Sequence, residues 1–128
     1  MATIDGTNGD DIRNGTDDDD AINGLAGNDT LNGGRGADTL DGGTGSDLLQ
    51  GGFEPDTYIV DNVGDRIVEV DEQGSSDIVY SSVTWTLGNY LEDLFLTGNA
   101  AISGTILLPI FRLVKIYCAS RLEDSVVG

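Results

Sequence analysis

The sequence predicts an all-β chain, a parallel β-roll built from nine-residue repeats and followed by a short β-rich capping segment. Glycine and aspartate recur at a fixed phase in the first sixty residues, which hold 13 of the 19 glycines. A large apolar residue follows two positions after most of these aspartates. From Thr57 onward the pattern changes to an alternation of apolar and polar residues, which is typical of strands.

Six nine-residue units run without a gap from Gly6 to Ile59. The first residue of every unit is glycine, at Gly6, Gly15, Gly24, Gly33, Gly42 and Gly51. The sixth is aspartate, at Asp11, Asp20, Asp29, Asp38, Asp47 and Asp56. The eighth is large and apolar at Ile22, Leu31, Leu40, Leu49 and Tyr58, and Arg13 departs from this rule in the first unit. A flexible linker rich in glycine would not need this fixed phase, so the period indicates a stacked repeat architecture.

The composition of each unit predicts a tight turn followed by a very short strand. Its first six residues are mostly glycine and small or polar side chains, which favour a turn because glycine tolerates positive φ. The last three contain one apolar position, which would face the core of the roll. Two units would close one coil of eighteen residues. Each unit would then stack on the unit two places along, about 4.8 Å away.

This stacking would gather the aspartates into two columns, with Asp11, Asp29 and Asp47 along one edge and Asp20, Asp38 and Asp56 along the other. Neighbouring carboxylates about 4.8 Å apart repel by roughly 3–4 kcal/mol at an effective dielectric of about 20. A divalent cation between the turns would remove this repulsion. Calcium suits such a place better than magnesium, because calcium accepts mixed carboxylate and carbonyl shells in flexible geometry and magnesium demands a rigid octahedron.

The repeats resemble those of the repeats-in-toxin proteins, also called hemolysin-type calcium-binding proteins, which bacteria export through type I secretion systems. The resemblance covers roughly residues 4–105. It implies that the aspartate side chains bind several calcium ions and that carbonyl groups of the first four turn positions complete each shell. The implied metal ligands are Asp11, Asp20, Asp29, Asp38, Asp47 and Asp56, with the turn residues Gly24, Gly27, Gly33, Gly34, Gly36, Gly42, Gly43 and Gly45.

Two of the six turns depart from the family pattern. Asp18 replaces glycine at the fourth position of the second unit, which should weaken that turn. Glu54 and Pro55 make the sixth turn irregular. We therefore expect the best-formed calcium sites between Gly24 and Asp47.

The chain divides into three predicted parts: the β-roll at residues 4–60, a β-rich cap continuing the roll at 61–105, and a tail at 106–128. Strands are expected at 57–60, 66–70, 77–81, 83–87 and 91–97, separated by turns at Gly64, Gly74 and Gly88. An open stack of strands ends in an exposed edge that invites further pairing, so a covering segment is expected there.

Alternation in the strand at 83–87 would place Val83, Trp85 and Leu87 on one face, which predicts that Trp85 packs in the core. The alternative is that Trp85, Tyr80 and Tyr90 form a stacking platform for a polysaccharide. The tail from 106 onward departs from the family pattern. It is open to three interpretations: an uncleaved secretion signal, a capping helix or strand, or a reading-frame artefact.

Charge and composition exclude several classes of function. The formal net charge is −17, from 23 acidic and 6 basic side chains, which disfavours nucleic acid and anionic membranes as partners. The longest apolar run is too short to span a bilayer. Histidine is absent and Cys118 is the single cysteine, so neither a histidine base nor an internal disulfide is available. No nucleophile elbow, zinc motif or phosphate loop is present, and no catalytic residue is expected.

The predicted function is a calcium-binding structural module of a secreted, extracellular bacterial protein. It would stay unfolded at low cytosolic calcium and fold on calcium binding after type I export. One alternative is a C-terminal accessory fragment of a secreted enzyme such as a protease, lipase or polysaccharide epimerase. Another is a polysaccharide-binding module. A monomer is expected in each case.

Overall fold

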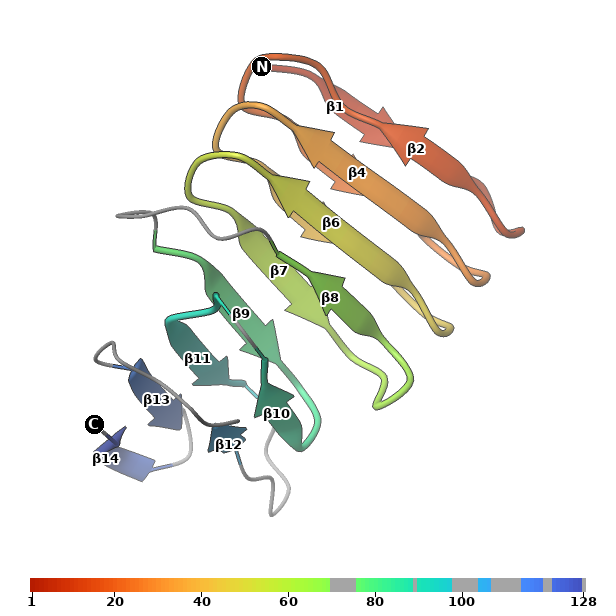
Figure 1. Ribbon diagram of the computed structural model, residues 1–128. Coiled ribbons are helices and arrows are strands. Elements are labelled where there is room, and N and C mark those ends of the chain that lie inside the picture. Colours follow the sequence, from red (N-terminus) through yellow and green to blue (C-terminus); the bar gives the residue numbers. More distant parts are fainter. Residues whose placement is uncertain (70–75, 89, 98–103, 107–113, 119–120, 128) are drawn as a thin grey trace.

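The computed structural model describes residues 1–69, 76–88, 90–97, 104–106, 114–118 and 121–127. Throughout these ranges the regular structure is β-strand, so the predicted all-β class is confirmed (Figure 1). The strands are β1 Thr3–Asp5, β2 Ile12–Asn14, β3 Ala21–Asn23, β4 Thr30–Gly34, β5 Thr39–Asp41, β6 Leu48–Gly52, β7 Thr57–Val60, β8 Arg66–Val68, β9 Ile78–Ser81, β10 Trp85–Leu87, β11 Asp93–Leu96, β12 Gly104–Ile106, β13 Val114–Cys118 and β14 Arg121–Val127. In the described part of the chain, no helix could span a membrane.

The strands wind into a solenoid of about five coils, which confirms the predicted parallel β-roll. One wall is an eight-stranded sheet in the order β1-β3-β5-β7-β9-β11-β13-β14, and the other is a four-stranded sheet in the order β2-β4-β6-β8. The pairing is parallel up to β13, which pairs with β14 in antiparallel orientation. The strands β10 and β12 form a separate parallel pair. Successive coils follow one another in sequence order along the stack (Figure 1).

Within the repeats, each strand pairs with the strand two units along the chain. Ile22 lies opposite Leu40, and Leu40 lies opposite Tyr58 in the same sheet. Leu31 lies opposite Leu49 in the other sheet. The predicted stacking of each unit on the unit two places along is therefore confirmed.

The core is the stack of eighth-position side chains. Ile22, Leu31, Leu40, Leu49 and Tyr58 have no solvent-exposed surface. Burying one such side chain contributes about 1.5–3 kcal/mol, so this stack is the main apolar support of the repeats. The flanking residues of each short strand point outward because side chains alternate along a strand.

The strands after the repeats extend both sheets of the roll. The predicted strand at 57–60 matches β7, and the strand predicted at 66–70 ends at Val68, with its last residue outside the described ranges. The strands predicted at 77–81, 83–87 and 91–97 are shorter at their ends, as β9, β10 and β11. The turn predicted at Gly74 also lies outside the described residues.

Trp85 belongs to the core of this later segment. It is 8% exposed and Leu87 is fully buried, while Val83 packs against the same cluster. Thr84 and Thr86 between them are exposed. The predicted common face of Val83, Trp85 and Leu87 is therefore confirmed.

Candidate metal centre

The six turns of the repeats begin at the six first-position glycines, and we number them one to six. Turns one, three and five stack along one edge of the roll, and turns two, four and six along the other, because units two places apart pair with each other. The structure thus brings the predicted aspartates together in two columns. Asp11, Asp29 and Asp47 make the first column, and Asp20, Asp38 and Asp56 make the second.

A backbone hydrogen bond joins each aspartate to the next in its column. In the first column, the Asp29 Oδ1 accepts the N–H of Asp11 at 2.7 Å, and the Asp47 Oδ1 accepts the N–H of Asp29 at 2.8 Å. The second column repeats this bond between Asp20 and Asp38 and between Asp38 and Asp56, each at 2.8 Å. One carboxylate oxygen of each linked aspartate is therefore committed to holding neighbouring coils together.

Three acidic residues continue the columns beyond the repeats, and sequence reasoning missed them. Asp65 accepts the N–H of Asp47, and Asp77 accepts the N–H of Asp56, both at 2.8 Å. Glu92 in turn accepts the N–H of Asp77 at 2.9 Å. Asp65 keeps the spacing of its column and directly precedes a strand, so the period could have found it. Asp77 and Glu92 do not keep that spacing, and the sequence carries no comparable signal for them.

In turns three, four and five the second carboxylate oxygen is buried. The Oδ2 atoms of Asp29, Asp38 and Asp47 have no hydrogen-bond partner among the described residues. A buried charged oxygen without a partner costs free energy, so this arrangement favours either a proton or a cation at that place.

Backbone carbonyl oxygens crowd the same place. A methyl group added at Gly24 would lie 2.4 Å from Asp29 Oδ2 and 2.6 Å from the Gly42 carbonyl oxygen of the next coil. A methyl group at Gly33 would lie 2.3 Å from Asp38 Oδ2 and 2.5 Å from the carbonyl oxygen of Gly51. Carboxylate and carbonyl oxygens, without an N–H or O–H donor to the free oxygen, are the hard ligands that calcium prefers. The residues present therefore fit a calcium ion.

The backbone of these turns passes through the left-handed region at two positions. The second and fourth residues have positive φ in turn three at Leu25 and Gly27, in turn four at Gly34 and Gly36, and in turn five at Gly43 and Gly45. Leu25 adopts a φ of 79° without being glycine, which is uncommon for a side chain of its size. The predicted turn glycines thus shape the backbone cradle, by which we mean the turn backbone around the buried Oδ2 atoms of Asp29, Asp38 and Asp47. Leu25 is accommodated in the same turn conformation.

Turn six differs although Asp56 lies in the second column as predicted. Its positive φ values fall at the same second and fourth positions as in turns three to five, but the fourth residue is Glu54 instead of glycine. The Tyr58 hydroxyl enters this turn and accepts the N–H of Gly51 at 2.8 Å. Asp56 itself is buried, with 1% of its surface exposed.

Turns one and two also differ, although the structure places Asp11 and Asp20 in their columns as predicted. The Oδ2 of Asp11 accepts hydrogen bonds from Thr7, and the Oδ2 of Asp20 accepts hydrogen bonds from Thr16. Arg13, at the eighth position of the first unit, forms an ion pair with Asp11 Oδ1 at 3.0 Å. These two carboxylates are therefore satisfied by the protein itself.

The two kinds of turn have opposite effects on acidity. Hydrogen bonds from the backbone N–H of Thr7 and Thr16 lower the pKa values of Asp11 and Asp20. Burial raises the pKa of Asp29, and it raises the pKa values of Asp38 and Asp47 to about 6. The buried carboxylates of the middle turns are thus the groups whose charge most needs a counter-ion.

This difference predicts that the calcium-free roll is more stable in acid. Burial raises the pKa values of Asp38 and Asp47 in the folded chain from 3.8 to about 6. Their contribution to stability is fully present below pH 3.8 and is lost as the pH rises through about 6. Circular dichroism of the chelated protein should therefore show more β-structure at acidic than at neutral pH. A β signal that stays constant across this interval, or grows with pH, would contradict the prediction.

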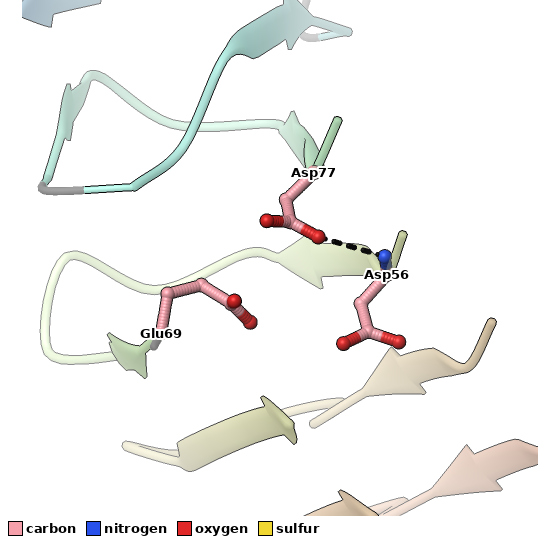
Figure 2. A group of neighbouring side chains, drawn as sticks. All are labelled: Asp56, Glu69 and Asp77. Carbon is pink, nitrogen blue, oxygen red and sulfur yellow. Dashed lines mark hydrogen bonds between the residues drawn. The ribbon is translucent and has the colours of Figure 1, made fainter. Parts of the chain in front are cut away.

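A second acidic group lies where the repeats give way to the following segment. Asp56, Glu69 and Asp77 each offer one carboxylate oxygen, and these three atoms lie within 4.8 Å of one another. Figure 2 shows the Glu69 side chain extending toward the two aspartates, while Asp77 accepts the N–H of Asp56. Glu69 is half-buried and the two aspartates are buried. The group is an extension of the second column rather than a separate centre, because Asp56 and Asp77 both belong to that column.

Comparison with protein families matches residues 14–49 to the RTX calcium-binding nonapeptide repeat, in four copies. Comparisons with curated proteins and with solved structures gave no match. The matched residues contain turns two, three, four and five entirely. They include the buried oxygens of Asp29, Asp38 and Asp47 described above. Residues 14–49 of this chain thus match the RTX calcium-binding nonapeptide repeat, and Ca²⁺ is the ion that this repeat implies.

Proposed function

We propose that the chain is a structural module that folds around several calcium ions. The ions would be held by the carboxylates of Asp29, Asp38, Asp47 and Asp56. Carbonyl groups of the glycine turns, at Gly24, Gly27, Gly33, Gly34, Gly36, Gly42, Gly43 and Gly45, would complete the shells. The single observation that carries the proposal is the set of buried Oδ2 atoms in turns three to five, which no donor of the described residues satisfies.

The surroundings of these oxygens support calcium over a structural role without metal. Residues 1–60 carry 13 acidic and 2 basic side chains, so the repeats contain too few basic side chains to neutralise their carboxylates. The described ion pairs involve Asp11 and Asp18, neither of which belongs to turns three to five. A divalent ion supplies the missing charge and links two coils at once.

The same chemistry supports a place in an exported protein. A chain that requires calcium for folding stays extended where free calcium is scarce and folds where calcium is abundant, which is outside the cell. We therefore place the module, with its cap at 61–105, in a secreted bacterial protein that leaves the cell by type I export. It acts there as a monomeric, non-catalytic part.

The aromatic residues of the cap give less support to polysaccharide binding. Trp85 is buried in the core, and Tyr80 stacks on Phe95 with ring centroids 5.0 Å apart. Tyr90 is exposed, but a stacking platform needs neighbouring aromatic faces that are open to the sugar. The calcium-binding module is therefore the better supported function.

Equilibrium dialysis of calcium tests the proposal directly. The wild-type chain should bind several ions, and the triple variant Asp29→Asn, Asp38→Asn, Asp47→Asn should lose most of them. The variant Asp10→Asn, Asp17→Asn, Asp93→Asn removes the same charge outside the columns and serves as the control, which should bind as the wild type does. Equal calcium binding by both triple variants would refute the assignment of the columns.

A further inference from the structure

The first two turns are closed by their own threonines. In turn one, Thr7 donates its backbone N–H at 2.6 Å and its hydroxyl at 2.8 Å to Asp11 Oδ2. In turn two, Thr16 makes the same two bonds to Asp20 Oδ2 at the same distances. Each threonine hydroxyl oxygen also accepts the N–H of the residue two places along, Gly9 or Asp18. The carboxylate oxygen that faces the cradle in the other turns is therefore satisfied here by two donors.

Position two of the unit separates these turns from the next three. It is Thr7 and Thr16 in the first two turns, and Leu25, Gly34 and Gly43 in turns three to five. The latter three residues have positive φ, and the two threonines do not. Position four does not decide the difference, because Gly9 is glycine and still lacks a positive φ.

The carboxylates occupy different places in the two kinds of turn. A methyl group added to the first glycine would lie 2.9 Å from Asp11 Oδ2 in turn one and 3.0 Å from Asp20 Oδ2 in turn two. The corresponding distances in turns three, four and five are 2.4, 2.3 and 2.2 Å. The carboxylate oxygens that the threonines hold thus lie further from the first glycine of their turn than those of turns three to five.

We propose that Thr7 and Thr16 take the place of calcium in turns one and two, so that ions are bound from turn three onward. This inference rests on the proposed function, and it removes Asp11 and Asp20 from the metal ligands expected from the sequence. A charged oxygen that accepts an N–H and an O–H bond is already well satisfied. An ion would have to displace both bonds, and the ion-binding turn would drive a β-branched threonine to positive φ, where such residues are rarely found. The first coil therefore closes without metal and offers a finished surface on which the calcium-dependent coils stack.

Two matched aspartate variants test the inference on the full chain. Asp20 and Asp38 lie in the same column, on consecutive coils, and both are buried. Calcium bound per chain is measured by equilibrium dialysis at saturating calcium, with Thr39→Val as the control for a change outside the turns. Asp20→Asn should keep the wild-type number of ions, and Asp38→Asn should lose at least one. A loss from Asp20→Asn equal to that from Asp38→Asn overturns the inference, whereas a wild-type chain without bound calcium overturns the proposed function itself.

The second part of the test is a variant that keeps every aspartate and is expected to bind more calcium. Thr7→Gly converts turn one from GTNGDD to GGNGDD, which has the glycines and aspartate of turns four and five. This variant should bind about one additional ion, because the freed carboxylate then faces an ion-binding turn. Thr7→Val keeps the β-branched side chain and the backbone N–H, and it should bind no additional ion. If Thr7→Gly binds only as many ions as the wild type, threonine does not decide which turns bind calcium.

Discussion

Removal of calcium at neutral pH is expected to abolish most of the β-structure of the roll. The middle turns place carboxylates one strand spacing apart, where each pair of neighbours repels by roughly 3–4 kcal/mol at an effective dielectric of about 20. The four neighbouring pairs in the two columns would together consume most of the 5–15 kcal/mol by which a typical domain is stable. Far-UV circular dichroism should therefore report a largely disordered chain in chelator. Titration with calcium should restore the β signal cooperatively, because each ion orders two coils.

The single tryptophan gives an independent measure of the same transition. Trp85 lies outside the repeats and is 8% exposed, packed in the same cluster as Leu87 and Leu94. Since β9 and β11 continue the sheet of the repeat strands β1, β3, β5 and β7, the cap should lose its support when the repeats unfold. Trp85 emission should shift to the blue, and quenching by acrylamide should decrease, over the calcium range that restores the β signal. A chelated chain with full β content, or a Trp85 that stays open to acrylamide in calcium, would contradict this coupling.

The regular part of the molecule could be predicted from the sequence because one period determines it. A nine-residue repeat with two units per coil places every sixth-position aspartate above another, and every eighth-position apolar residue in the core. Leu31 and Leu40 therefore have the burial that their phase predicts. Arg13, in the first coil, is the exception to the apolar eighth position. It forms an ion pair with Asp11 instead of packing in the core.

The division of the turns into two kinds depends on details that the period does not contain. Thr7 and Thr16 are visible in the sequence, but their effect depends on hydrogen-bond geometry that only the folded turn reveals. Leu25 is misleading in this respect, because a bulky residue at position two would not be expected at positive φ. It nevertheless follows the turns of its glycine-containing neighbours, which indicates that stacking on adjacent coils overrides its local preference.

The continuation of the aspartate columns beyond the repeats could be predicted only in part. Asp65 keeps the period and could have been predicted, whereas Asp77 and Glu92 follow insertions and deletions between coils. Glu69 approaches Asp56 and Asp77 from a different part of the chain, and no repeat position predicts this approach. Three-dimensional stacking, rather than sequence spacing, brings these carboxylates together.

Substitution of Gly45 by alanine is expected to be among the most damaging single changes in the roll. An added methyl group would lie 2.0 Å from the carbonyl oxygen of Gly27 and 2.7 Å from its carbonyl carbon, at a φ of +108°. Side-chain rotation cannot relieve this contact, because the added methyl group is fixed to the backbone of residue 45 and the atoms it meets are backbone atoms of Gly27. Left-handed backbone costs alanine about 1–2 kcal/mol, and the forced shift of the coils adds about 1–3 kcal/mol. Gly45→Ala should therefore lower the free energy of unfolding by about 3 kcal/mol, measured by denaturant titration in saturating calcium.

The matched control for this change is Gly9→Ala, at the same position of the unit and along the same edge of the roll. The nearest heavy atom to its added methyl group would be Thr7 Oγ1 at 3.8 Å, and its φ is not positive. Gly9→Ala should consequently change the free energy of unfolding by no more than about 0.5 kcal/mol. The methyl group at Gly45 meets turn three, the preceding turn of the same column, whereas the methyl group at Gly9 meets only its own turn. The contrast between the two variants therefore measures how tightly a calcium-type turn is stacked on the turn before it. Equal losses for both would mean that turns one and five have the same backbone, and the distinction between threonine-closed and calcium-type turns would then have to be abandoned.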